Sequence, residues 1–296
     1  MAVVIASHHM VDSRGSGSMK RPDVKLENYE AVYRYYEAHD QSRAFARLAH
    51  KLFARHFKVD LSVADGAEQA ITDAIAAGTR LVISPNHITG DDQYVIVALV
   101  EHMKALHPLR ASTFIPSEPS LFTRRGLAGK ALRRSVDGLG AVPTFRLEDL
   151  RRQGIEITDE IDELYRHATI RASEAQVAKL VRGEKMAGFW EGTRNRSDYR
   201  VVQPLKKGIA HTVIAAAEQI DVAVLPVGFY YGSEPDDYKR PDVPGKRNPH
   251  VHVGMPIPVE TTSATELVDL VHPAMQECLD VVVARAVAAA GALTPV

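Results

Sequence analysis

Short apolar segments alternate with longer amphipathic segments through most of this chain, and this alternation constrains the fold more than any other feature. Apolar runs that predict strands lie at residues 81–84, 112–115, 140–145, 186–190, 222–229 and 250–255. Segments with helical character separate them, at residues 68–77, 91–106, 124–134, 147–182, 205–218 and from 263 onward. Strands that alternate with helices are typical of an α/β sandwich. The sequence therefore predicts a mixed, mostly parallel sheet flanked by helices.

Residues before this alternation predict a small N-terminal helical segment. Between residues 25 and 60 the apolar side chains Phe45, Leu48 and Leu52 fall on one helical face. Basic side chains recur every four residues beside this face: Arg43, Arg47, Lys51 and Arg55. Such a helix either lies in a membrane interface, with its cations toward anionic headgroups, or packs on the core with its basic side chains in solvent. Both interpretations stay open.

Three regions are expected along the chain. Residues 1–18 contain His8, His9 and a Gly-Ser run, which are typical of a cloning-derived or disordered leader. Residues 19–78 form the helical segment, and residues 79–296 form the α/β domain. A loop rich in turn-forming residues is expected at 232–249, and Ser173 to Gln176 matches a helix-capping box.

Composition excludes several classes of protein. Lys and Arg total 36 against 37 for Asp and Glu, a net charge of -1, so a general nucleic-acid binder is not expected. The single cysteine, Cys278, rules out an internal disulfide and a thiolate metal cluster, which favours a reducing compartment. No apolar run reaches the roughly 18 residues of a spanning helix. We therefore expect a cytoplasmic protein, either free or peripheral on a membrane surface.

The first candidate site follows the strand at 81–84. His87 lies in the loop at the carboxyl end of this strand, where ligands bind in α/β sheets, and Asp92 follows in the first turn of the next helix. A carboxylate that accepts the histidine Nδ1 proton leaves Nε2 free as a general base. The alternative is a loop histidine, with Asp91 and Asp92 complementing the helix dipole.

The second candidate site follows the strand at 186–190. Glu191, Gly192, Thr193 and Arg194 present a carboxylate, a flexible backbone, a hydroxyl and a guanidinium in succession, which suits a phosphate or a polyhydroxylated group. Lys206 and Lys207 then begin the next helix and add positive charge. The alternative is a polar turn between a strand and a helix.

Two weaker features complete the pattern. Arg146 ends the strand that starts at Gly140, and either binds an anion or terminates the strand in solvent. The apolar strand around Pro226 is expected to be buried rather than part of a site. A basic run lies between Asp92 and Gly140: Arg124, Arg125, Lys130, Arg133 and Arg134. This run either holds phosphates, an acidic carrier protein or anionic headgroups, or is a solvated helix face.

Four blocks, in this order, resemble the glycerolipid acyltransferase family. They are Asn-His-x4-Asp, Gly-x5-Arg, Phe-x-Glu-Gly-Thr-Arg and Val-x-Pro-Val, and the resemblance covers roughly residues 79–258. The best-known members are the 1-acylglycerol-3-phosphate and glycerol-3-phosphate acyltransferases. The chain departs from the family at Trp190, where proline is usual, and at Asn195, where serine is common. The segment between Arg146 and Phe189 is also longer than usual.

This resemblance implies an O-acyltransferase of phospholipid synthesis. The donor would be acyl-CoA or an acyl-carrier protein, and the acceptor 1-acylglycerol-3-phosphate or, alternatively, glycerol 3-phosphate. His87 would be the general base and Asp92 its partner. The acceptor pocket would be formed by Arg146, Glu191, Gly192, Thr193, Arg194 and Lys207. Backbone amides near Gly192 would bind the oxyanion.

Cofactors and partners follow from the same resemblance. Neither a metal nor a cofactor is expected beyond the acyl thioester, and partners are the donor, a phosphorylated glycerol or lysolipid acceptor, and an anionic membrane surface. Two rival classes remain at this point. One is a lipid or acyl-CoA binding protein without activity, and the other is a phosphohydrolase in which Asp91 and Asp92 hold a divalent metal.

Overall fold

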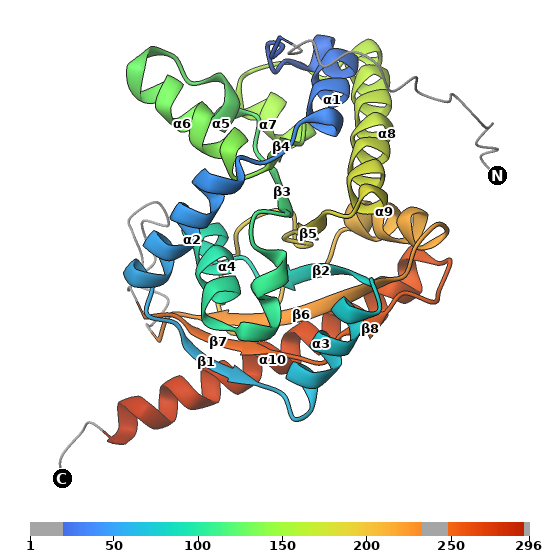
Figure 1. Cartoon of the computed structure of the whole chain (residues 1–296). Helices are drawn as coiled ribbons and strands as arrows, with labels where there is room; N and C mark the ends of the chain where they lie inside the picture. The colour runs from blue at the N-terminus through green and yellow to red at the C-terminus, as the bar shows by residue number, and fades with distance from the viewer. Residues whose placement is uncertain (1–19, 233–247, 293–296) are drawn as a thin grey trace.

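The computed structural model describes residues 20–232 and 248–292 (Figure 1). The expected leader at 1–18 lies outside the described residues, as does most of the loop expected at 232–249. Within the described part of the chain, no helix is long and apolar enough to cross a membrane.

One mixed sheet of eight strands forms the centre of the described chain. In chain order the strands are β1 (Asp60–Val63), β2 (Arg80–Pro85), β3 (Thr113–Ser117), β4 (Ala141–Pro143), β5 (Lys185–Ala187), β6 (Val222–Tyr230), β7 (His250–Val253) and β8 (Ile257–Pro258). Their order in the sheet is β1-β7-β6-β2-β5-β3-β4, and β8 also pairs with β6. Only β6 with β7 and β6 with β8 run antiparallel among the pairs formed by these strands. The predicted mostly parallel α/β sheet is therefore confirmed.

Helices cover both faces of this sheet. They are α1 (Tyr29–Ala38), α2 (Arg43–His56), α3 (Ala67–Ala76), α4 (Asp92–His102), α5 (Ser120–Thr123), α6 (Gly126–Gly138), α7 (Leu147–Arg152), α8 (Asp159–Arg182), α9 (Lys207–Ala217) and α10 (Ala264–Ala292), with 3-10 turns at Leu26–Asn28 and Lys104–Leu109. In Figure 1, α10 lies behind β6 and β7 while α4 lies in front of the sheet. Every residue of β6 is buried, because this strand is covered on both faces.

Helix α10 packs very closely against the sheet at Gly228 of β6. A Cβ atom at this position would lie 2.4 Å from the backbone carbonyl of Cys278 in α10, so only glycine lets the helix pack this closely. Burial raises the pKa of the Cys278 thiol to about 12. The only cysteine of the chain is thus a packing residue and not a reactive thiolate.

The N-terminal segment contains a strand that the sequence analysis missed. We expected only helices between residues 19 and 78, but β1 pairs in parallel with β7, with Asp60 opposite His250. A four-residue edge strand has too little periodicity to be recognised, and its partner lies about 190 residues away in the sequence. Helix α2 lies where it was expected and buries Ala46, Ala49 and His50 against α4. Its larger apolar residues Leu48 and Leu52 remain 54% and 52% exposed.

Two helix boundaries also differ from expectation. Ser173 does not begin a helix, because α8 continues through it and its hydroxyl pairs with that of Thr212 at 2.8 Å. The N-cap of α8 is Thr158, whose hydroxyl accepts from the Ile161 amide. The helix expected at 91–106 ends at His102, because Met103 is extended and a 3-10 turn follows.

Candidate active site

Loops at the carboxyl ends of neighbouring parallel strands form the candidate site. Strands β2 and β5 pair in parallel, with Val82 opposite Met186, so the loops that follow them leave the same edge of the sheet. The backbone amide of Asn195 donates to the backbone carbonyl of His87 at 2.7 Å and joins the two loops directly. The first and third sequence blocks, more than 100 residues apart, therefore meet in space.

The His87 ring is held by a carboxylate and by an aromatic ring. Its Nδ1 donates to Asp92 Oδ2 over 2.9 Å, since an ionised carboxylate only accepts. Phe189 stacks on the imidazole with a centroid separation of 3.9 Å and an interplanar angle of 17°. The His87 side chain is 19% exposed and lines a cleft, whereas the Asp92 side chain is fully buried. The imidazole thus has a fixed orientation, and Nε2 is the ring nitrogen that does not bond to Asp92.

Further donors fix the Asp92 carboxylate. Oδ2 accepts from the backbone amides of Ile88 and Thr89 at 2.6 and 2.9 Å. Oδ1 accepts from the Thr89 hydroxyl at 2.9 Å and from the Tyr231 hydroxyl at 2.6 Å. Burial and the neighbouring Asp92 charge raise the pKa of Tyr231 well above its ordinary value, so this hydroxyl remains a donor. The sequence analysis missed Tyr231, because no local motif relates the end of β6 to the helix that carries Asp92.

Glu191 lies beneath the site instead of facing the cleft. Its carboxylate is buried and accepts from the His87 amide at 3.0 Å, the Gln203 amide at 3.0 Å and the Gln203 side chain at 3.3 Å. Burial, and to a smaller extent the Asp92 charge, outweigh the effect of these hydrogen bonds and raise the pKa of Glu191 to about 7. The structure therefore places Glu191 as a support for the loop that carries His87. It is not among the residues that line the cleft.

Arg146 and Gly192 contact each other at the edge of the cleft. The Arg146 guanidinium donates to both Asp149 oxygens, at 2.7 and 3.0 Å, and to the Gly192 carbonyl at 2.7 Å. Two of its five N–H donors remain for a ligand. Gly192 has a φ of 73°, and its amide donates to the Phe189 carbonyl at 3.0 Å. That amide is thus engaged in a turn and does not have the free orientation that we expected of an oxyanion donor.

Of the other predicted binding residues, two line the cleft and one lies outside it. Thr193 and Arg194 line the cleft, as does Lys206. Lys207 does not, because its ammonium group donates to the Thr265 hydroxyl at 2.8 Å, at the start of α10. Successive residues at a helix start point about 100° apart, so one of two adjacent lysines faces the cleft and the other turns away. The sequence alone could not show which one.

The cleft has a volume of about 490 Å³, within the range of sites for small molecules. Basic residues dominate its charged lining, and we call them its basic side; they are Arg124, Arg146, Arg152, Arg194, Arg196 and Lys206, and the acidic Glu118 also lines the cleft. Of the basic run at 124–134, only Arg124 lines the cleft. A wall formed by residues of α8 and α9 contributes no charged side chain to the lining. The site therefore combines one imidazole, several cationic side chains and an uncharged polar wall.

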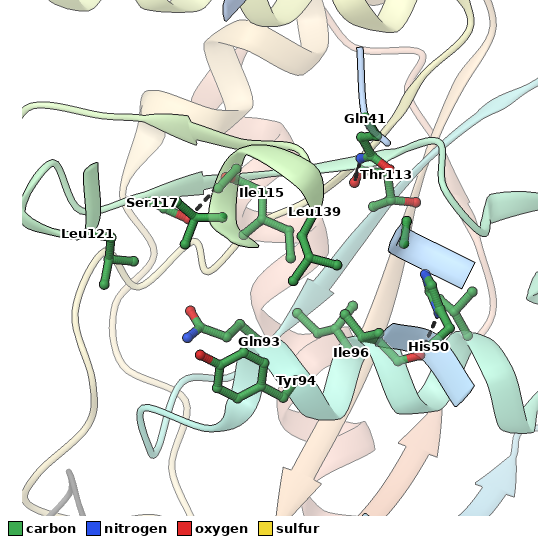
Figure 2. Close-up of a pocket in the computed structure, with 15 residues that line it drawn as sticks. Gln41, His50, Gln93, Tyr94, Ile96, Thr113, Ile115, Ser117, Leu121 and Leu139 are labelled. Atoms are coloured by element: carbon green, nitrogen blue, oxygen red, sulfur yellow. Dashed lines mark hydrogen bonds between the residues drawn. The ribbon is translucent and has the colours of Figure 1, made fainter. Parts of the chain in front are cut away.

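A smaller apolar pocket opens beside this cleft (Figure 2). Its volume is about 60 Å³, and four of its residues also line the cleft: Gln93, Ile115, Ser117 and Leu121. Ile96 of α4 and Leu139 lie further along the pocket, and His50 of α2 lies at the far side from Leu121 in Figure 2. His50 Nδ1 donates to the Val97 carbonyl at 2.9 Å, and burial lowers the pKa of this histidine. The pocket is thus uncharged and mostly apolar.

Metal-ligating side chains are scattered in the described ranges. Within residues 20–232 and 248–292, no three His, Cys, Asp or Glu side chains form a group that could hold a metal ion. Both Asp92 oxygens accept hydrogen bonds within the protein, as described above, and neither faces the cleft.

Comparison with known families gives one match. Residues 67–230, more than half of the 296-residue chain, match the sequence model of the family described as Acyltransferase. None of the curated proteins compared with the chain matches it.

Proposed function

Since the chain belongs to the acyltransferase family, we propose that it transfers a fatty acyl group from an acyl thioester to the hydroxyl of a glycerol-phosphate-type acceptor. The donor is acyl-CoA or an acyl-carrier protein. The acceptor is 1-acylglycerol-3-phosphate, with glycerol 3-phosphate as the alternative, and the product enters phospholipid synthesis. The observation that carries this proposal is the His87–Asp92 pair of 2.9 Å at the edge of a basic cleft.

His87 acts as the general base in the proposed reaction. Nδ1 donates to Asp92, so Nε2 accepts the proton of the acceptor hydroxyl while the hydroxyl oxygen attacks the thioester carbonyl. The tetrahedral intermediate then expels the thiolate, which takes the proton from His87, and the products are an ester and a free thiol. Asp92 stabilises the imidazolium during this step, and stacking on Phe189 limits rotation of the ring. A positioned general base contributes on the order of 100- to 10,000-fold to the rate.

The basic side of the cleft suits the acceptor's phosphate. Arg194 and Arg146 both line the cleft, and a guanidinium makes forked contacts with phosphate oxygens. Lys206 adds a third positive charge from the start of α9. A negatively charged acceptor is therefore drawn to the side of the cleft that carries these residues.

The apolar pocket suits the part of the donor's acyl chain that lies next to the thioester. It shares Gln93 with the cleft, and Gln93 directly follows Asp92 in α4, so the pocket begins beside the catalytic pair. Burial of apolar chain atoms against Ile96 and Leu139 is favourable by roughly 25 cal/mol per Å². The thioester carbonyl would then lie between this pocket and the phosphate-binding side.

Helix α2 suits a peripheral contact with an anionic membrane. Leu48 and Leu52 are exposed beside Arg47, Lys51 and Arg55, so one surface offers apolar side chains and cations together. An acceptor that is itself a lipid would be presented at such a surface.

A direct assay tests the proposed function. Product mass and thiol release are measured with acyl-CoA or acyl-carrier protein and each acceptor, for the wild type and for His87→Ala. The variant should lose about 100-fold or more of the rate and keep its thermal midpoint, because His87 is a partly exposed loop residue. His211→Ala, an exposed histidine of α9, is the matched control and should keep full activity. Activity of His87→Ala near the wild-type level would refute the general-base role, and absence of transfer by the wild type to any acceptor would favour a binding protein.

A further inference from the structure

The uncharged wall of the cleft contains a polar group without a hydrogen-bond partner among the described residues. This wall consists of residues of α8 and α9, including Thr169, Ser173, Gln176 and Thr212. Ser173 and Thr212 pair with each other at 2.8 Å, and the Thr169 hydroxyl donates to the Tyr165 carbonyl of its own helix. These three hydroxyl groups are therefore engaged within the protein.

Gln176 is the exception on this wall. The residue is only 5% exposed, it lines the cleft, and no hydrogen bond joins its side-chain amide to any described residue. The fully enclosed side-chain atoms without a partner belong to other residues, so the Gln176 amide keeps access to the cleft. The amide of Gln176 is thus placed to bond with whatever fills the cleft.

Two further polar atoms of cleft-lining residues lack partners. Trp190 Nε1 and Thr144 Oγ1 are both enclosed, and neither has a hydrogen-bond partner in the described chain. Of the three unpartnered groups, only the Gln176 amide is therefore accessible from the cleft.

We propose that the uncharged wall binds a neutral, hydroxyl-rich group, such as a glycerol or a cyclic polyol, that the acceptor carries beyond its phosphate. This inference rests on the proposed acyl transfer, and it replaces the phosphomonoester acceptor named there by a phosphodiester. A primary amide offers two donors and one acceptor atom, and a hydroxyl group both donates and accepts, so the two are complementary. The phosphate would stay on the basic side, next to Arg194, and the acyl chain of the donor in the apolar pocket.

Binding of soluble headgroups tests this assignment without any reaction. The probes are glycerophosphoinositol and glycerophosphomethanol, which carry the same phosphodiester charge and differ in the neutral polyol. By calorimetry, the wild type should bind the first about tenfold more tightly than the second, because the polyol gains hydrogen bonds to a buried amide. Gln176→Leu should reduce this preference to about twofold or less and leave the affinity for CoA unchanged.

Stability and a matched variant separate binding from folding. Leucine fills a similar volume without a polar group, so the thermal midpoint of unliganded Gln176→Leu should equal or exceed that of the wild type. Gln69→Leu, the same change on the exposed face of α3, should keep the wild-type preference.

Three results would overturn the inference. They are equal binding of the two probes by the wild type, a preference that survives Gln176→Leu, and a loss of affinity for CoA in that variant, which would assign the wall to the donor. A wild type that keeps the preference but transfers no acyl group would refute the proposed function and leave this inference standing.

Discussion

Replacement of Glu191 by glutamine provides a sharp test of how the site is supported. The pKa of this buried carboxyl is raised from 4.5 to about 7, mainly by burial. A group with a raised pKa keeps its proton longer in the folded state than in the unfolded state. The contribution of Glu191 to the stability of the folded wild type is therefore greatest below pH 4.5 and is lost as the pH rises toward 7 and above. The full shift corresponds to about 3 kcal/mol.

Glu191→Gln removes this titration and introduces a different cost. The wild-type carboxylate accepts hydrogen bonds from the backbone N–H groups of His87 and Gln203. In the variant the amide NH2 must face one of these N–H groups, and two donors that face each other cost about 1 to 3 kcal/mol at any pH. The variant should therefore have a lower free energy of unfolding than the wild type at pH 5. Between pH 5 and pH 8 the wild type should lose about 2 to 3 kcal/mol of this free energy relative to the variant, which reduces or reverses the difference. Activity should also fall, because His87 loses a contact that holds its loop.

Urea unfolding at pH 5, 6, 7 and 8 measures this effect. Trp190 is the single tryptophan of the chain, is buried and directly precedes Glu191, so its fluorescence reports unfolding near the substitution. Glu68→Gln, on the exposed first turn of α3, serves as the matched control and should show no pH-dependent difference from the wild type. Parallel stability curves for Glu191→Gln and the wild type across this range would refute the assigned ionisation of Glu191.

Three further predictions follow from the same geometry. Tyr231→Phe removes a hydroxyl that donates to the buried Asp92 at 2.6 Å, so the free energy of unfolding in urea should fall by about 1.5 to 3 kcal/mol. An unchanged free energy of unfolding would contradict this hydrogen bond. Lys206→Ala should raise the acceptor KM, whereas Lys207→Ala should not, since only the former lines the cleft; equal effects in steady-state assays would argue against that placement. The double variant Leu48→Glu and Leu52→Glu should weaken sedimentation with anionic phosphatidylglycerol vesicles but keep its turnover of soluble acceptors, and undiminished binding to vesicles would exclude α2 as the contact.

Local patterns were sufficient to predict much of the fold. Alternating apolar strands and helices predicted the mostly parallel sheet, because side-chain burial on a strand or a helix face leaves a periodic record in the sequence. The strands β2, β3 and β6 lie close to their predicted positions. Strand β1 was missed, since its pairing with β7 depends on a segment far away in the sequence. Ser173 was taken for a helix start because a capping pattern does not reveal whether a helix already passes through it.

The same distinction applies to the site. The contact between His87 and Asp92 could be anticipated, because five residues of a strand-to-helix turn bring the two side chains together locally. The burial of Glu191 could not, since it depends on the parallel pairing of β2 with β5, which places the second loop directly beneath the first. The contribution of Tyr231 likewise depends on β6 lying next to β2.

The sequence by itself determined the elements of this protein and the chemistry of its short motifs, because helical and strand periodicity and the order of polar residues are local properties. Only the tertiary structure decided which polar groups face the cleft. Lys206 faces it while Lys207 turns to α10. Gln176 also lines it without a hydrogen-bond partner among the described residues, although nothing in its neighbourhood along α8 marks it. The physical reason is that exposure and hydrogen bonding depend on which distant segments pack against a residue, and this is settled by sheet order and helix packing.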